Sequence, residues 1–135
     1  MNHRVEDRHV PAFALYFIAG LALITLATAI FVRLTPFPEM ELIAQGNQAA
    51  AWVFLGTVIG FALPVSSAIA HSVSMVDMLS WTVLGLLVQY LAHLAIRMLL
   101  PGFVQGVRDG VTSLGIASAG LSVAVGLVNA ASLVF

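Results

Sequence analysis

Four long apolar segments constrain the fold of this sequence more than any other feature. They cover roughly residues 11–32, 47–70, 78–100 and 111–135. As helices rising 1.5 Å per residue, each is long enough to cross about 30 Å of hydrocarbon. Barrel strands need about half that length and alternate in polarity, which these segments do not. Because lipid offers the backbone no hydrogen-bond partner, we predict an all-α integral membrane protein with four transmembrane helices.

The composition supports lipid as the main partner of the chain. Apolar residues make up 61% of the 135 positions and charged residues 8%, against about 25% charged residues in soluble domains. We therefore predict one membrane domain over residues 1–135. A net charge of −1 without a basic cluster argues against nucleic-acid binding.

The same composition leaves little room for catalysis. The lack of cysteine excludes thiolate metal centres and cysteine nucleophiles. The four histidines, at positions 3, 9, 71 and 93, lack the spacing of a strong metal site. Ser67 and His71 are one helical turn apart, but Asp77, the nearest acid, is better explained as a helix cap. We predict no enzyme activity, no cofactor and no metal.

The first apolar segment could be mistaken for a cleaved signal peptide. Arg4 and Arg8 precede it, and Ala27-Thr28-Ala29 has the small-x-small pattern of a cleavage site. The segment is longer than the roughly 7–15 residues of a signal core, however, so we favour a retained first helix.

Residues 64 positions apart indicate an internal repeat. Arg33, Gly46 and Gly56 recur as residues 97, 110 and 120. The predicted units are two helical hairpins, residues 11–70 and 71–135, with the same orientation in the membrane. Each contains a short interfacial connection, in which we expect Met40 and Ile43 to share one face in the first copy, and Phe103 and Val107 in the second.

Four helices place both termini on one side of the membrane. Arg4 and Arg8 lie on the terminal side, and the opposite side carries Arg33, Arg97 and Arg108. The positive-inside rule then favours, by a narrow margin, cytoplasmic connections and extracytoplasmic termini.

Small residues recur every four positions on the second and fourth segments. Gly56, Gly60 and Pro64 form one such stripe, and Ser122 and Gly126 belong to the other. Stripes of this kind let membrane helices approach closely. Pro64 removes the hydrogen bond to the carbonyl of residue 60, and Ser66 and Ser67 are placed to help satisfy the backbone beyond it. The second segment is therefore either a kinked packing helix or a hinge or pore wall that exposes free carbonyls.

Polar residues align on one face of the third segment. Gln89, His93 and Arg97 are spaced by four, and we expect Arg97 to snorkel towards the headgroups. Gln89 and His93 lie deeper and need partners, for which Asn129, Ser122 and Ser67 are candidates. Two interpretations stay open: hydrogen bonding between helices, or a conduction or binding path made pH-sensitive by the histidine.

The block Gly56-x-x-x-Gly60-x-x-x-Pro64-x-Ser66-Ser67 is the most specific of several stretches with a family resemblance. Together these stretches resemble the YjfL-like family of small bacterial inner-membrane proteins. The resemblance implies a four-helix membrane protein with a duplicated hairpin, and it supplies no biochemical activity. The other matching residues are Thr35-Pro36, Glu39, Leu42-Ile43, Gly46-Asn47, Ala49-Ala50, Thr57, Ala68, Ser72-Val73-Ser74, Asp77, Trp81, Gln89, Leu100-Pro101, Gly126 and Asn129-Ala130-Ala131.

These features lead to two expectations about function. The two small-residue stripes exceed what one contact between hairpins requires, which favours a non-enzymatic scaffold or assembly subunit. Such a subunit would work as a homo-oligomer or beside another envelope protein. The alternative is an oligomeric ion or proton channel, or a small transport protein, that uses the Pro64 helix and the Gln89–His93 face.

Overall fold

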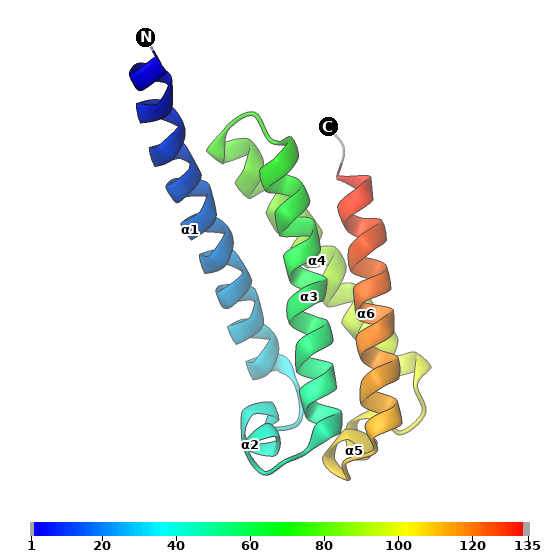
Figure 1. The fold of residues 1–135 in the computed structure, drawn as a ribbon. Helices are drawn as coiled ribbons and strands as arrows, with labels where there is room; N and C mark the ends of the chain where they lie inside the picture. The colour runs from blue at the N-terminus through cyan, green and yellow to red at the C-terminus, as the bar shows by residue number, and fades with distance from the viewer. Residues whose placement is uncertain (1, 134–135) are drawn as a thin grey trace.

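The computed structural model describes residues 2–133, with side chains from Val10 onward, and it is almost entirely helical. The described residues form four long helices and two short ones, and Figure 1 shows how they are arranged. Four helical stretches are long and apolar enough to span a membrane: Val10–Leu34, Gln48–His71, Met75–Leu99 and Thr112–Ser132. The predicted all-α membrane fold is confirmed. In chain order the helices are α1 (Asn2–Leu34), α2 (Glu39–Ala44), α3 (Gln48–His71), α4 (Met75–Leu99), α5 (Phe103–Arg108) and α6 (Thr112–Ser132).

Both ends of the described chain lie at one end of the bundle, and α2 and α5 lie at the other (Figure 1). We call these the terminal end and the connection end. Helices α1 and α4 run towards the connection end, and α3 and α6 run back from it. Which end faces the cytoplasm stays a prediction.

Side-chain caps fix where two of the long helices begin. Asn47 caps α3 by accepting a hydrogen bond from the Ala50 N–H at 3.0 Å. Ser74 caps α4 in the same way through the Asp77 N–H at 3.1 Å, so this helix begins at Met75, three residues before the predicted start. Helix α1 begins at Asn2 and continues through Pro11, so it starts before the predicted span of residues 11–32. Helix α6 ends at Ser132 with Leu133 as its C-cap, short of the predicted end, and residues 134–135 lie outside the described part of the chain.

The two connections have the same local structure 64 residues apart. Helices α2 and α5 have equal lengths and are offset by 64 positions. Each is followed by a glycine with positive φ, Gly46 at 89° and Gly110 at 77°, a conformation that glycine adopts without strain. The hydrogen bonds that close these turns also correspond, Asn47 N–H to Leu42 at 2.9 Å and Val111 N–H to Gly106 at 2.8 Å. The duplicated hairpin remains a prediction, which these equivalences support.

Helices α3 and α6 make the most extensive helix–helix contact of the bundle. A methyl group on Gly56 would overlap the Cα of Ala119, and one on Gly126 would lie 3.0 Å from the carbonyl oxygen of Gly60. The two small-residue stripes therefore pack against each other within one chain. The sequence had suggested that these stripes offer a face to a second copy of the chain. That expectation is corrected, because each stripe is already buried against the other.

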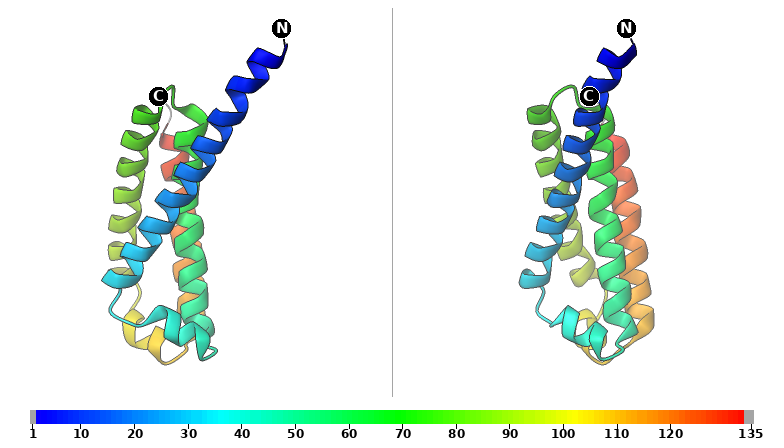
Figure 2. Two further views of the ribbon diagram at one scale, coloured as in Figure 1. Left: turned by 90° about the vertical axis from the view of Figure 1, so that its left-hand side faces the viewer. Right: turned by 60° about the vertical axis from the view of Figure 1, so that its left-hand side comes forward.

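Helix α1 is the most loosely held of the four long helices. It is inclined to the other three and diverges from them towards its N-terminal end (Figure 2). It also has the smallest buried share of the four membrane-spanning segments. An apolar groove of about 590 Å³ opens between α1 and α3, with Ile24, Phe54 and Val58 in its walls.

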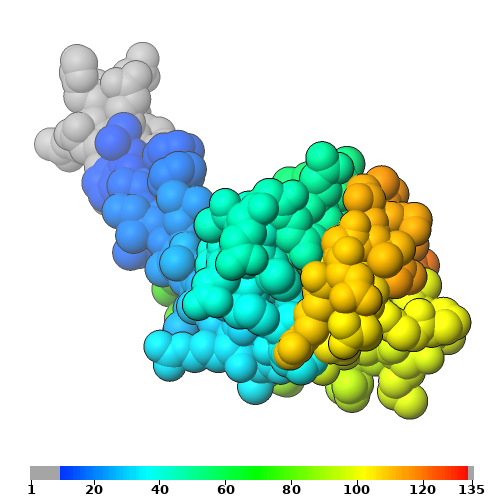
Figure 3. All heavy atoms as spheres, turned by 90° about the horizontal axis from the view of Figure 1, so that it is seen from below, coloured from blue at the N-terminus to red at the C-terminus, as the bar shows by residue number. Residues whose placement is uncertain are grey.

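Helices α2 and α5 together cover the connection end, as the view from below shows (Figure 3). Under them lies a small apolar core in which the Phe37 and Phe103 rings meet edge to face at 6.2 Å between centroids. The Asn47 amide donates across this core to the Val107 carbonyl at 2.8 Å. These contacts tie the two predicted hairpins together at the connection end.

Candidate functional site

A column of buried polar side chains runs along the bundle between α3, α4 and α6. We call it the polar column and define it, from the terminal end to the connection end, as Ser67, Asn129, Gln89, Ser122 and His93. Each of these side chains is at most 7% exposed. Polar groups at membrane depth are costly unless they face protein or water, so each needs a partner.

The middle of the polar column is hydrogen-bonded between helices. Asn129 donates from its amide nitrogen to the Gly85 carbonyl at 2.8 Å and to Gln89 Oε1 at 3.2 Å. Gln89 donates in turn to the carbonyl oxygen of Ser122 at 3.3 Å. The structure thus brings Gln89 together with Asn129 and Ser122, two of the three partners that the sequence suggested.

Ser67, the third suggested partner, bonds elsewhere. Its hydroxyl donates to the Ala130 carbonyl of α6 at 2.6 Å and lies 3.4 Å from Nδ1 of His71. Its neighbour Ser66 is exposed and donates to the Ala62 carbonyl of its own helix at 2.7 Å. Helix α3 continues unbroken through Pro64. The side chain of Pro64 packs against Gly85 of α4.

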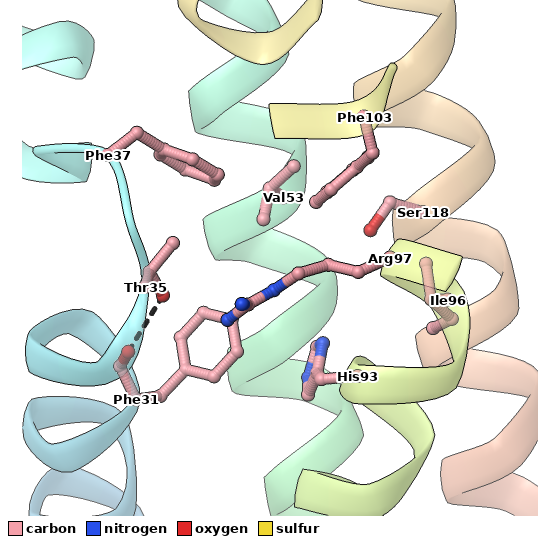
Figure 4. A pocket seen from close by; sticks show the side chains of 9 residues that line it. All are labelled: Phe31, Thr35, Phe37, Val53, His93, Ile96, Arg97, Phe103 and Ser118. Carbon is pink, nitrogen blue, oxygen red and sulfur yellow. Dashed lines mark hydrogen bonds between the residues drawn. The ribbon is translucent and has the colours of Figure 1, made fainter. Parts of the chain in front are cut away.

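His93 marks the connection-end half of the polar column. Its Nε2 lies 3.3 Å from the Ser122 hydroxyl. Its ring lies beside two phenylalanines, with centroids 4.4 Å from Phe31 and 6.0 Å from Phe61. A cavity of about 10 Å³ adjoins it, also lined by Ser118 (Figure 4). That volume accommodates about one water molecule.

The Arg97 side chain does not extend outward towards the headgroups, as the sequence had predicted. It lines the same cavity as His93, and in Figure 4 its side chain extends from α4 across the cavity towards Phe31 on α1. The sequence had predicted a snorkelling arginine at a helix end. The side chain instead turns inward because the chain after α1 folds over this end of the bundle and encloses it.

Glu39 is the buried ionisable residue that the sequence analysis missed as a site residue. It is 0% exposed, and neither carboxylate oxygen has a hydrogen-bond partner among the described residues. Met40, which was expected to share one face with Ile43, is 46% exposed, whereas Ile43 is half-buried. A six-residue helix is too short for its periodicity to identify the buried face. One signal was available: position 39 corresponds to Phe103, which is also buried.

The surroundings of Glu39 favour its neutral form. Burial raises the pKa of its carboxyl from 4.5 to about 7, although the nearby Thr35 hydroxyl and the Arg97 charge both lower it. Thr35 donates its own hydrogen bond to the carbonyl oxygen of Phe31 at 2.7 Å. The connection end therefore holds a carboxyl group poised between its neutral and charged forms near neutral pH.

Comparison with known proteins identifies the family of the chain. The Domain of Unknown Function DUF350 matches residues 6–133, almost the whole sequence. The chain belongs to the DUF350 family. It is 32% identical to the UPF0719 inner membrane protein YjfL of Escherichia coli K12 over 120 residues, covering 89% of this chain and 91% of the relative. It is 28% identical to the UPF0719 transmembrane protein YshE of Bacillus subtilis 168 over 130 residues, covering 95% and 96%.

The DUF350 assignment confirms the resemblance drawn from the sequence. Together with the four apolar helices, it identifies a multi-pass inner-membrane protein. The names of these two relatives give a location and no activity. No solved structure matches the chain. The function must therefore be argued from the polar column and the residues at its connection end.

Proposed function

We propose that this DUF350 protein is a small, non-enzymatic transport protein of the inner membrane that moves protons or small ions along its polar column. The observation that supports the proposal is the series of buried polar side chains from Ser67 to His93, followed by the half-buried Arg97. Ionisable residues inside membrane helices are costly and commonly mark proton or ion paths. Arg97 and Glu39 extend the series to the connection end.

The small interior space of a single chain favours transport of protons over transport of larger ions. Its interior cavity beside His93 has about 10 Å³, too little for a hydrated cation. Protons need no open pore. The Ser122 hydroxyl and the His93 imidazole, 3.3 Å apart, can exchange a proton directly. The Gln89 and Asn129 amides do not relay protons themselves, so passage along the middle of the polar column requires water molecules beside them. A wider aqueous path would require several copies of the chain, so the homo-oligomer predicted from the sequence belongs to the ion version of the proposal.

Purified protein in liposomes that contain a pH-sensitive dye tests the proposal. We expect an imposed pH gradient to collapse faster than in empty vesicles, and His93→Leu to return the rate to that of empty vesicles. Ser66→Ala is the matched control, because this serine is exposed and bonds only within its own helix. Wild-type vesicles that are no leakier than empty ones, across pH and several ions, would contradict transport.

An oligomeric scaffold or assembly subunit is the second candidate. Its original basis was an excess of small-residue faces, but Gly56 and Gly126 are taken up inside the chain. The observation that now favours it is the open apolar groove of about 590 Å³ between α1 and α3, where a second copy or another envelope protein would fit. If Val58→Trp in this groove changed the size of the purified particle while the flux stayed the same, assembly would use this groove.

A further inference from the structure

We propose that Glu39 is a proton-binding site at the connection end, which exchanges protons between the adjoining aqueous phase and the polar column. The first step, proton binding, stands on the geometry of Glu39 alone. The second step, delivery to the column, rests on the proposed transport function.

The burial of an unpartnered carboxylate is the starting observation. Both oxygens of Glu39 lack a hydrogen-bond partner among the described residues, and the residue is 0% exposed. A charged carboxylate in that position forfeits its hydration, which is unfavourable by several kcal/mol for an ion in a protein interior. The Arg97 charge and the nearby Thr35 hydroxyl offset only part of this cost, because the net effect of the surroundings is to raise the pKa of Glu39. Binding a proton removes the charge and supplies the group with an O–H donor.

The ligand is a proton rather than a metal ion. No group of three or more histidine, aspartate or glutamate side chains is close enough to hold a metal among the described residues. Glu39 is also not among the residues that line the cavity beside His93. A cation at the carboxylate would need its own space and further oxygen ligands, whereas a proton needs neither.

One cation governs the balance between the two forms of the carboxyl group. Arg97 reaches in from α4, and its charge favours the carboxylate. Arg33 on α1 lines the groove on the α1–α3 side, and Arg108 on α5 donates to the carbonyl of Pro36. Helix α3 carries no charged residue at this end, since His71 is at its far end.

The remaining ionisable groups near this end do not oppose the assignment. Glu41, on the same short helix as Glu39, is exposed to solvent. Asp109 accepts a hydrogen bond from the Gln105 amide at 2.9 Å, and His93 faces Ser122. Glu39 is thus the fully buried carboxylate at this end among the described residues. It lies within range of the Arg97 charge, and Arg97 lines the same cavity as His93 of the polar column.

Infrared difference spectroscopy of the whole protein in nanodiscs tests proton binding directly. We expect a protonated-carboxyl band that disappears as the pH rises through about 7, in agreement with the raised pKa of Glu39. The band should be lost in Glu39→Gln and retained in the matched control Glu41→Gln. A band that persists in Glu39→Gln, or that titrates near the ordinary value of 4.5, would overturn the proposal.

A second variant separates an electrostatic role of Arg97 from a structural one. Arg97→Gln should shift the titration of the band to higher pH, because the charge that favours the carboxylate is gone. An unchanged titration would overturn this part of the proposal. Glutamine is close to the protonated side chain in shape, so Glu39→Gln should fold, and circular dichroism checks that it does.

The same preparations distinguish this proposal from the proposed function. If the band titrates as expected but vesicles show no proton flux, Glu39 binds protons and the transport function is wrong. If vesicles show flux that Glu39→Gln leaves unchanged, transport stands and the delivery of protons by Glu39 is refuted.

Discussion

The two predicted hairpins use corresponding positions in opposite ways. In the second, Gln89, His93, Arg97, Ser118 and Ser122 lie at the polar column or the cavity beside it. The positions 64 residues earlier are Thr25, Ala29, Arg33, Phe54 and Val58, and all five line the open groove between α1 and α3. Corresponding positions thus form a buried polar interior in one hairpin and an open, mostly apolar groove in the other.

In the short helices the pattern is reversed, because the polar residue belongs to the first hairpin and the apolar residue to the second. Glu39 on α2 corresponds to Phe103 on α5, and both side chains are buried at the connection end. The phenylalanine contributes to the apolar core there, while the glutamate brings a carboxyl group within range of the Arg97 charge. The two hairpins have similar backbones, yet each contributes ionisable groups to the connection end: Glu39 from the first hairpin, and His93 and Arg97 from the second.

The largest expected effect contrasts Gly56 with Gly120, its counterpart 64 residues later. A methyl group on Gly56 would overlap the Ala119 backbone, whereas one on Gly120 meets nothing within 4 Å. We expect Gly56→Ala to lower the free energy of unfolding by about 3 kcal/mol or more, since neither backbone can yield easily. Gly120→Ala should change it by less than about 0.5 kcal/mol. Unfolding by dodecyl sulfate, followed by circular dichroism, measures both, and equal effects would refute the α3–α6 contact.

The next effect concerns Glu39 and pH. Because the folded carboxyl has its pKa raised from 4.5 to about 7, the folded state holds its proton more tightly than the unfolded state. The free energy of unfolding should therefore be highest below pH 4.5, fall as the pH rises from 4.5 to about 7, and level off above about 7. The total loss should be about 3 kcal/mol. Repeating the unfolding measurement across pH tests this, and a slope unchanged in Glu39→Gln would assign the dependence to another group.

Removing Asn129 should have an intermediate effect. Asn129→Ala leaves Gln89 Oε1 without its donor inside the bundle. We expect a loss of about 1 kcal/mol, typical of a polar contact between membrane helices. Ser132→Ala on the same helix is the control, because Ser132 is exposed and bonds to its own Val128 carbonyl. Similar losses in the two variants would show that the polar column adds nothing to stability.

The smallest effect transfers a cap from one hairpin to the other. Asn47 caps α3 with its side chain, while its counterpart Val111 gives α6 no side-chain cap at nearly the same backbone angles. We expect Val111→Asn to stabilise the protein by about 0.5 kcal/mol. Asn47→Ala removes the hydrogen bond to Val107 as well as the cap, so we expect it to destabilise the protein by about 1–2 kcal/mol, more than the cap alone. Thermal unfolding in detergent detects both shifts. If Val111→Asn destabilised the protein, the two helix starts would not be equivalent.

Much of the fold follows from local sequence signals. Apolar length fixed the four spans, and Gly46 and Gly110 fixed the ends of the short helices. Two of the partners of Gln89 also followed from the rule that buried amides must be bonded across helices.

The rest depended on tertiary arrangement. The inward course of Arg97 depends on the connection that folds over it, and the burial of Glu39 depends on the face that a six-residue helix presents. Likewise, small-residue stripes indicate close approach without naming the partner helix. Periodicity along one segment carries none of this information.

The closest helix contact, between α3 and α6, has a consequence for biosynthesis. These helices are separated by the whole of α4 and α5, so the glycine-lined face of α3 has no partner while the first half of the chain enters the bilayer. Translation proceeds from the N-terminus, and α6 emerges last from the ribosome. In the nascent protein, the small-residue face of α3 must therefore stay exposed to lipid until synthesis is nearly finished. A chain truncated before α6 would keep this face without its partner helix.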